Sequence, residues 1–446
     1  MTKLAEAILD PRVRSPNYFS GRLLAASDLA AERDAHLARQ RMLGRAIGAG
    51  IVEGLWVAPA ASATAERPAV TVSKGFAIDL DGQLLSLSDD QTLVISETFT
   101  EEGDAPETTC LFRPCIPPST DAEPSGDGFY LLVMGATSRF EETAPMQALQ
   151  TTKAGAGCGR KWAVPGVRFR LQPFNPLNVP GVGDSTRDSL ADALSQTVSP
   201  AVLSRLRNLL AHLCFASDEL AAHTADPWAV EDDATPLLSG YGVVDYLRRL
   251  GLIRTCELPL ALIYWTGDGL QFADCWAVRR RVIATPLSPA WPSLSSQRLS
   301  AENEARLLQF QEHSRSLLDA VPAPSALAAR DYFRFLPAVG LLSLATTTRK
   351  GFTTAAYFNG LKRRAEAIHM DSARLRELLN LSLTHPPIDT ETDEVVFIYR
   401  PHRNKPLPPA SAAEQTYAVF ASGHLPYVGT ARFDLARWNR SNYGLL

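Results

Sequence analysis

The feature that most constrains this chain is a long charged helix near its N-terminus that ends in glycines and leads directly into a strand. Apolar residues recur at helical spacing over 27–47, with charged residues between them, so the pattern predicts one amphipathic helix. Ser27 can cap it, and Asp28 lies where a negative charge meets the positive end of the helix dipole. The sequence Gly48-Ala49-Gly50 would end the helix, and 51–57 is typical of a strand.

These glycines do not fit a nucleotide-binding loop. A phosphate cradle needs a strand before the glycines and a helix N-terminus after them. Here the expected helix precedes Gly48 and the strand follows it, so a phosphate would meet the negative end of the dipole. An aromatic–glycine segment, Asn17-Tyr18-Phe19-Ser20-Gly21-Arg22-Leu23-Leu24, leads into the helix. The order of turn, helix and strand favours an assembly module over an active site.

Composition narrows the class of protein. The 446 residues allow two to four domains, and 46% hydrophobic with 21% charged residues is ordinary globular usage. A net charge of −4 argues against nonspecific nucleic-acid binding. The N-terminus does not have the pattern of a signal peptide, no apolar run is long enough to span a membrane, and six cysteines do not make a disulfide framework. We therefore expect a cytoplasmic protein.

Strand and helix signals predict an α+β fold: an N-terminal mostly-β, sandwich-like domain with one long helix, a helical middle block, and a C-terminal α+β domain. The corresponding ranges are 1–175, with 256–285 as a candidate completion, 185–255 and 299–446.

The expected elements follow from local patterns. The clearest turns are Asp81-Gly82, in a predicted meander over 70–95, and Thr266-Gly267-Asp268-Gly269, between predicted strands 258–265 and 270–282. Further strands are predicted at 129–134, 395–399 and 417–421, helices at 200–215, 241–252, 300–320 and 370–383, and loops or linkers at 98–128, 172–190 and 284–298.

No catalytic motif is visible, and none of the eight histidines belongs to a metalloprotease or hydrolase pattern. We expect no cofactor, no metal and no catalytic residue. Two alternatives stay open. Cys110, Cys115 and Cys158 would need a fourth ligand such as Cys214 to hold zinc. A ligand-binding or enzymatic pocket near His424 and Asp434 is the alternative function, since glycine and aromatic residues are dense there.

A run of three arginines follows the second hairpin strand. If that strand continues to 282, Arg279 and Arg281 share one face, and Arg280 shares the other with Trp276. We expect Arg279 and Arg281 to meet carboxylates across a domain or subunit boundary, and the Arg280 head to turn to solvent. The simpler alternative is a solvated strand end.

Residues 17–95 resemble the first domain of the type VI secretion baseplate component TssK, a fold similar to the shoulder domain of phage receptor-binding proteins. The matching positions are Phe19, Gly21, Leu23, Leu24, Asp28, Leu29, Glu32, Arg33, Gly50, Ile51, Leu55, Gly75 and Asp81-Gly82. The chain departs from TssK at Gly48-Ala49-Gly50, which lacks the tryptophan typical of that family, and its C-terminal domain does not match the TssK head. The whole chain looks like uncharacterised proteins of phage-tail-like contractile injection systems.

The resemblance implies a structural, non-enzymatic protein at the periphery of a baseplate. It implies a homo-oligomer, trimeric in the TssK case, whose other partners are baseplate or further injection-system proteins. The candidate attachment and interface residues are Tyr18, Phe19, Gly21, Arg22, Leu23, Leu24, Arg279 and Arg281.

Overall fold

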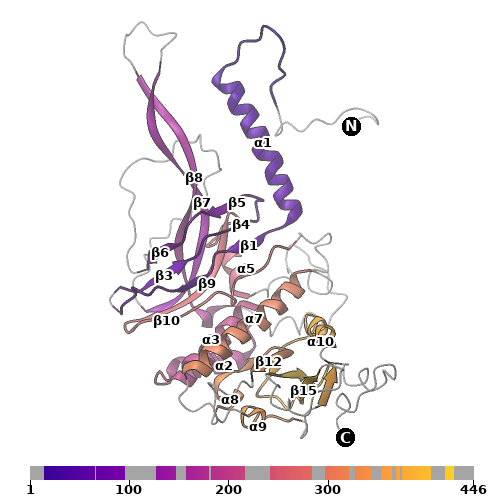
Figure 1. Cartoon of the computed structure of the whole chain (residues 1–446). Coiled ribbons are helices and arrows are strands. Elements are labelled where there is room, and N and C mark those ends of the chain that lie inside the picture. The colour runs from indigo at the N-terminus through magenta and orange to yellow at the C-terminus, as the bar shows by residue number, and fades with distance from the viewer. Residues whose placement is uncertain are drawn as a thin grey trace, which may run out of the picture.

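A computed structural model shows the architecture of the chain (Figure 1). It describes residues 15–65, 67–95, 127–146, 157–179, 182–215, 242–283, 297–320, 327–343, 353–363, 368–371, 374–402 and 417–425. The predicted α+β organisation is confirmed: sheets form the N-terminal and C-terminal parts, and helices lie between them.

The N-terminal part centres on a four-stranded antiparallel sheet in the order β10-β9-β7-β8. Its strands are β7 (Gly128–Met146), β8 (Gly157–Phe174), β9 (Glu257–Thr266) and β10 (Gly269–Asp274). Two three-stranded sheets accompany it, in the orders β1-β4-β5 and β2-β3-β6. Their strands are β1 (Gly50–Gly54), β2 (Val57–Pro59), β3 (Ala69–Val72), β4 (Gly75–Ile78), β5 (Leu84–Leu87) and β6 (Gln91–Val94).

Alternation along β7 divides the side chains between two cores, because successive residues of a strand point to opposite faces. Tyr130, Leu132 and Met134 pack with residues of the two small sheets. Phe129, Leu131 and Val133 pack instead with helices of the middle block. The central sheet is therefore covered by strands on one face and by helices on the other.

The middle block consists of the short helix η2 (Pro176–Asn178), α2 (Asp184–Ser195), α3 (Pro200–Phe215) and α5 (Gly242–Arg249). In α3 every residue from Leu206 to Phe215 is buried, so this helix is surrounded on all sides. Its leucines contribute to the same core as the odd-numbered residues of β7.

The C-terminal part has a four-stranded sheet in the order β12-β16-β15-β13, with a β11-β14 pair beside it. One core joins this sheet to α7 through Phe310 and Leu317, and a second joins it to α10 through Leu378. The elements are α7 (Gln297–Ala320), α8 (Ala329–Tyr332), β11 (Phe335–Leu336), β12 (Val339–Ser343), α9 (Thr354–Tyr357), β13 (Ile368–Asp371), α10 (Leu375–Ser382), β14 (Ile388–Asp389), β15 (Val396–His402) and β16 (Tyr417–Ser422).

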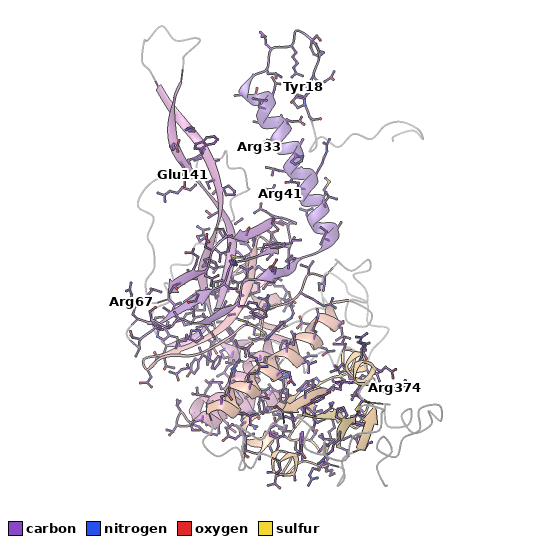
Figure 2. The ribbon with its side chains drawn as sticks, in the orientation of Figure 1. Tyr18, Arg33, Arg41, Arg67, Glu141 and Arg374 are labelled. Carbon is purple, nitrogen blue, oxygen red and sulfur yellow. The ribbon has the colours of Figure 1, made fainter. Side chains whose placement is uncertain are left out.

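Two elements project from the N-terminal sheets, away from the C-terminal part (Figure 1). One is α1 (Ala26–Ile47). The other is the outer part of the β7–β8 hairpin. β7 pairs with β9 only over Gly128–Gly135, whereas it pairs with β8 as far as Met146. Beyond Gly135 the hairpin is therefore a two-stranded ribbon, and Figure 2 shows Glu141 on this projecting part.

Several local expectations are wrong. The predicted meander is two sheets, because β3 pairs with β2 and β6 while β4 pairs with β1 and β5. Residues 172–190 are not simply a linker, since they contain η2 and the start of α2. The second hairpin strand ends at Asp274 rather than 282, and the predicted helix at 370–383 begins only at Leu375.

Of the predicted loop at 98–128, residues 98–126 lie outside the described residues, and Gly128 already belongs to β7. Asp434, Cys110 and Cys115 also lie outside the described residues. Within the described part of the chain, no helix is long and apolar enough to cross a membrane.

Candidate assembly surface

We call residues 17–47, the turn and the helix α1 that follows it, the N-terminal arm. It begins with a turn that depends on glycine. The amide N–H of Arg22 donates a 3.2 Å hydrogen bond to the carbonyl oxygen of Phe19, which closes a four-residue turn. Gly21, the third residue of this turn, has φ +87°, as a type II turn requires. A Cβ at Gly21 would meet nothing within 4 Å. The constraint on this residue is therefore its backbone conformation, and not the lack of space for a bulky side chain.

Arg22 and Asp28 fix the turn to the start of α1. The Arg22 guanidinium donates to the Asn17 carbonyl oxygen and to the Asp28 carboxylate, both at 2.6 Å. The second Asp28 oxygen accepts a hydrogen bond from the backbone N–H of Ala25. This backbone hydrogen bond and the neighbouring arginine lower the pKa of Asp28. The N-cap residue is Ala25, so the expectation that Ser27 caps the helix is wrong.

The turn and α1 present apolar side chains to solvent. Leu23 is 93% exposed and Phe19 is 65% exposed. The remaining exposed apolar residues of the arm are Tyr18, Leu24, Leu29, Met42, Leu43 and Ile47. Figure 2 shows Tyr18 at the far end of the arm. Of the 22 residues in α1, only Ala35 and Gly44 are buried, so the apolar stripe noted in the sequence does not pack against the body of this chain.

The base of the arm rests on the turn between β4 and β5. A Cβ at Gly44 would collide with the carbonyl oxygen of Gly82, so the helix and the turn touch through their backbones. The Arg41 guanidinium donates to the Gln83 side chain, and that of Arg45 donates to the Asp81 carbonyl oxygen. The Asp81-Gly82 hairpin turn, predicted from sequence, therefore supports the arm. Gly44 was not singled out, although a glycine inside a helical pattern is a packing signal.

The side chains of Arg279, Arg280 and Arg281 do not alternate between the two faces of a strand, as the sequence had suggested. The chain leaves the strand at Asp274, whose carboxylate accepts from the Ala277 N–H and starts a turn. Arg279 is buried and lies over the Trp56 ring, with its guanidinium carbon 3.8 Å from the ring centroid. It also donates to the Leu55 carbonyl oxygen. The described partners of Arg279 are thus the rings of Trp56 and Trp276 and a carbonyl oxygen, and not the expected carboxylate.

Arg280 and Arg281 both pair with acidic residues of α7. Arg281 lies 2.6 Å from Glu304 and is half exposed. Arg280 lies 2.6 Å from Glu302 and donates to the Trp276 and Ala277 carbonyl oxygens. The expectation that Arg280 faces solvent is therefore wrong. Through these two ion pairs, the segment that follows β10 contacts the first turns of α7. The arginine segment is therefore an internal contact between the N-terminal and C-terminal parts.

A serine–histidine contact occurs in the core, but the donor and acceptor roles in its hydrogen bond are the reverse of those that catalysis needs. The Ser204 hydroxyl donates to the Tyr332 carbonyl oxygen, so it must accept from Nε2 of His313, 2.9 Å away. Nδ1 of His313 then accepts from the Gln309 amide. A catalytic histidine would instead accept the serine proton through an unprotonated nitrogen. Both residues are buried, so this contact is structural.

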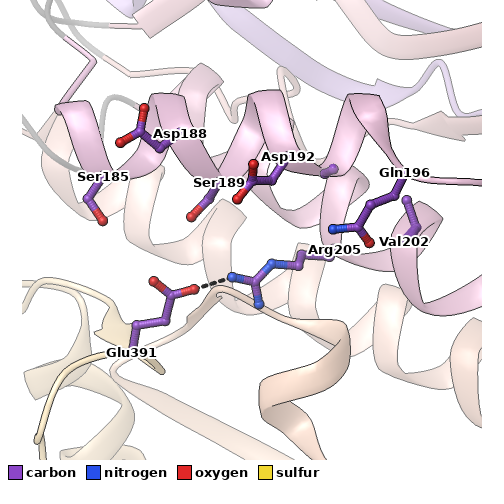
Figure 3. Close-up of a pocket in the computed structure, with 9 residues that line it drawn as sticks. Ser185, Asp188, Ser189, Asp192, Gln196, Val202, Arg205 and Glu391 are labelled. Atoms are coloured by element: carbon purple, nitrogen blue, oxygen red, sulfur yellow. Dashed lines mark hydrogen bonds and ion pairs between the residues drawn. The ribbon is translucent and has the colours of Figure 1, made fainter.

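A pocket of about 580 Å³ lies between α2, α3 and the loop after β14 (Figure 3). It is lined by Ser185, Asp188, Ser189, Asp192, Ala193, Gln196, Val202, Arg205 and Glu391. Two of its lining residues, Arg205 and Glu391, form an ion pair with each other, and Arg334, next to the pocket, donates to Ser185, Ser189 and Asp389. This pocket was not predicted, and its paired side chains do not form a nucleophile–base arrangement.

Neither the thiols that the structure describes nor His424 supports the alternative functions. Cys214 is buried, and desolvation raises its pKa to about 12, which disfavours the thiolate that zinc needs. Cys256 is disulfide-bonded, a state that the composition did not predict. His424 is exposed and lies in a turn after β16. Within the described residues, no group of three or more His, Cys, Asp or Glu side chains is placed to hold a metal ion.

No family model matches this chain, and no curated protein sequence matches it. Among solved structures, the chain is similar to one described as "Crystal structure of TssK", at 12% sequence identity over 93% of each chain, with a TM-score of 0.23. A TM-score this low carries no argument about the fold or the function of the chain.

Proposed function

We propose that this protein is a structural component at the periphery of a baseplate in a phage-tail-like contractile injection system, and that it acts through protein–protein assembly. The observation that supports the proposal most directly is the exposure of the N-terminal arm. Most of the stability of a helix in a protein comes from the tertiary packing of an apolar face, yet α1 buries only two residues and leaves Leu29, Leu43 and Ile47 exposed. Such a surface is typical of an element that a partner covers.

The attachment site in this proposal is the turn formed by Tyr18, Phe19, Gly21, Arg22, Leu23 and Leu24. Its backbone conformation is held by Gly21 and by the Arg22–Asp28 ion pair, so the exposed aromatic and leucine side chains are presented in one arrangement. Preorganised apolar anchors of this kind bind with little loss of conformational entropy. The sequence resemblance over 17–95 supports the same assignment. We expect a baseplate or other injection-system protein to cover this turn.

The protein also associates with itself in this proposal, and the resemblance implies a trimer. In this proposal the protein holds one rigid part of the assembly to another in a symmetric arrangement, which requires no chemical reaction. We place it in the cytoplasm, within an assembled particle. Light scattering of dilute purified protein tests self-association, since a monomer has a mass of 48.5 kDa. A clean monomer at micromolar concentration would count against this part of the proposal.

Incorporation into assembled particles tests the attachment site. Leu24→Asp should remove the protein from purified particles, because a partner that covers residue 24 would bury an unpaired carboxylate at a cost of several kcal/mol. Val198→Asp is the matched control, since Val198 is exposed to a similar extent but lies between α2 and α3. Normal amounts of the Leu24→Asp protein in particles would place the attachment site elsewhere.

The alternative function, an enzyme or ligand-binding protein with a pocket near His424 and Asp434, has a separate test. His424→Gln should leave particle assembly and injection unchanged if the protein is structural. A selective loss of a measurable turnover, with assembly intact, would favour the enzyme.

A further inference from the structure

We propose that β7 accepts an extended segment of a different protein as an added strand, along its open edge at residues 136–141. The segment would continue the position that β9 occupies beside the first half of β7. The inference goes beyond the proposed function, because it concerns a surface apart from the turn at residues 18–24. Figure 1 shows the β7–β8 ribbon and α1 as separate projections.

The open edge is the side of the ribbon that β9 leaves uncovered. β9 pairs with β7 only as far as Gly135, and among the described strands only β8 pairs with β7 beyond this residue. The chain that leads into β9 bonds elsewhere: the Thr255 carbonyl oxygen accepts a 3.1 Å hydrogen bond from the N–H of Leu80, in the β4–β5 turn. The side chains from Ser138 to Glu141 are half-buried or exposed. This edge of β7 is therefore accessible over most of a strand length.

The prolines of β8 show which backbone groups face the open edge. Opposite residues in antiparallel strands alternate between pairs that exchange hydrogen bonds and pairs that do not. Proline has no N–H, so Pro165, opposite Ser138, fits the second kind of pair. Pro173, an even number of positions along the same strand, gives the same alternation. The backbone N–H and C=O groups of Ser138 therefore point away from β8, toward the open edge, and those of Ala136 and Phe140 follow by alternation.

The two edges of the ribbon differ in their capacity to bind a strand. On the outer edge of β8 the prolines face outward and remove donors, and prolines at such positions protect a sheet edge from pairing. β7 has no proline between Gly135 and Pro145. Its extended conformation is interrupted at Glu142, which has φ +56°. The stretch from Ala136 to Glu141 is about 20 Å long, which is the length of a typical strand.

The open edge requires an extended occupant. N–H and C=O groups at strand spacing are satisfied by another strand, and main-chain hydrogen bonds provide the affinity in complexes of this kind. A two-stranded ribbon is only marginally stable in water, so a third strand would also stabilise the ribbon. The added strand would lie beside the half-buried Phe140 on one face and beside the exposed Arg139 and Glu141 on the other. We expect a segment in which apolar and polar residues alternate.

A second copy of this chain is a less suitable occupant. Copies arranged in a ring would set the β7 edge of one ribbon against the β8 edge of the next, where Pro165 offers no donor. Pairing of β7 with β7 would be two-fold, unlike the trimer of the proposed function. The occupant is therefore a segment of a different protein, and its site does not include the turn at residues 18–24.

Selection of peptides on the full chain tests the inference. A library of random peptides of about ten residues, the upper length of common strands, is selected against the immobilised unmutated protein. Each enriched peptide is then measured on two proline variants. Ser138→Pro removes a donor from the open edge and leaves the hydrogen bonds between β7 and β8 in place. Ala163→Pro is the matched control, because the Ala163 N–H points outward from β8, as the nitrogen of Pro165 does.

We expect a set of enriched peptides, alternately apolar and polar, whose affinity falls at least about tenfold on Ser138→Pro and is unchanged on Ala163→Pro. Hydrogen exchange of the unmutated chain needs no variant, and a bound peptide should protect the amides of residues 136–141 and leave those of 161–168 unchanged. Peptides that bind both variants equally or protect only other segments, or the absence of any enriched peptide, would overturn the inference. Self-association that Ser138→Pro alone abolishes would also overturn it, since the occupant would be a second copy. None of these outcomes depends on incorporation into a particle, so the proposed function is tested separately.

Discussion

The guanidinium of Arg207 donates a 2.6 Å hydrogen bond to the carboxylate of Asp274, and both residues are buried. This pair joins α3 of the middle block to the last residue of β10. The same carboxylate accepts from the Gln309 amide of α7, so a single side chain connects the N-terminal sheet, the helical block and the C-terminal part. A buried carboxylate with three donors around it fixes how these parts are placed.

Asp274→Asn should destabilise this junction strongly. The asparagine NH₂ group would face the Arg207 and Gln309 donors, which leaves the buried guanidinium with only the partly exposed Glu312, 3.6 Å away, as its counter-charge. Breaking a buried pair in this way costs about 3 to 5 kcal/mol in the free energy of unfolding. Chemical denaturation measures the loss. Glu142→Gln, which removes an exposed ion pair with Lys161, is the contrasting control and should cost less than about 1 kcal/mol. Similar losses in the two variants would contradict the role of Asp274.

The support beneath the arm should depend on pH through Asp79. Burial raises the pKa of Asp79 from 3.8 to about 6, so the folded protein binds a proton more tightly than the unfolded chain does. The stabilisation from this proton is complete below about pH 4 and is lost as the pH rises through about 6. Asp79→Asn should remove this component of the pH dependence, amounting to about 2 to 3 kcal/mol.

The measurement is the difference in unfolding free energy between the Asp79→Asn variant and the unmutated chain at several pH values. The variant should gain relative stability toward pH 7. Asp268→Asn, in the exposed β9–β10 turn, is the matched control for the same substitution at the surface. A pH-independent difference for Asp79→Asn would show that this carboxyl does not titrate in that range.

Gly44→Val should detach the base of the arm. Any Cβ at this position collides with the backbone of Gly82, and neither backbone can move without separating α1 from the β4–β5 turn. Hydrogen exchange of the backbone amides in the second half of α1 should become faster. Ala46→Val adds the same β-branched side chain at an exposed position of the same helix, and it should leave exchange nearly unchanged. Unchanged exchange in Gly44→Val would mean that this contact does not hold the arm.

Arg279→Lys should destabilise the protein although it keeps the positive charge. The flat guanidinium lies over the Trp56 ring and donates to the Leu55 carbonyl oxygen, a geometry that an ammonium group does not reproduce. We expect a loss of about 1 to 2 kcal/mol. Arg281→Lys, at the half-exposed pair with Glu304, should be close to neutral in thermal unfolding. The reverse order of the two variants would contradict this assignment.

Local sequence determined the elements whose signals lie within a few residues. The helix predicted at 200–215 has the same bounds as α3, because leucines at helical spacing follow a proline that suits a first turn. The turns Asp81-Gly82 and Thr266–Gly269 connect the strands they were expected to connect, because glycine accepts the positive φ that tight turns need. The start of α2 was missed, since Asp184 and Ser185 are as typical of loops as of helix beginnings.

Only the tertiary structure decided which surfaces meet. The Leu29 to Ile47 stripe has the spacing of a buried helix face, yet it is exposed, because periodicity does not specify whether the covering surface belongs to the same chain. The directions and partners of the Arg279 and Arg280 side chains depend on where β10 ends. The Asp274 carboxylate accepts a hydrogen bond from the Ala277 N–H, and the chain turns there. The arginines after this turn therefore do not follow the alternation of a strand. The pairing of β4 with β1, and of β3 with β2 and β6, likewise comes from contacts between residues distant in sequence, which local propensity does not encode.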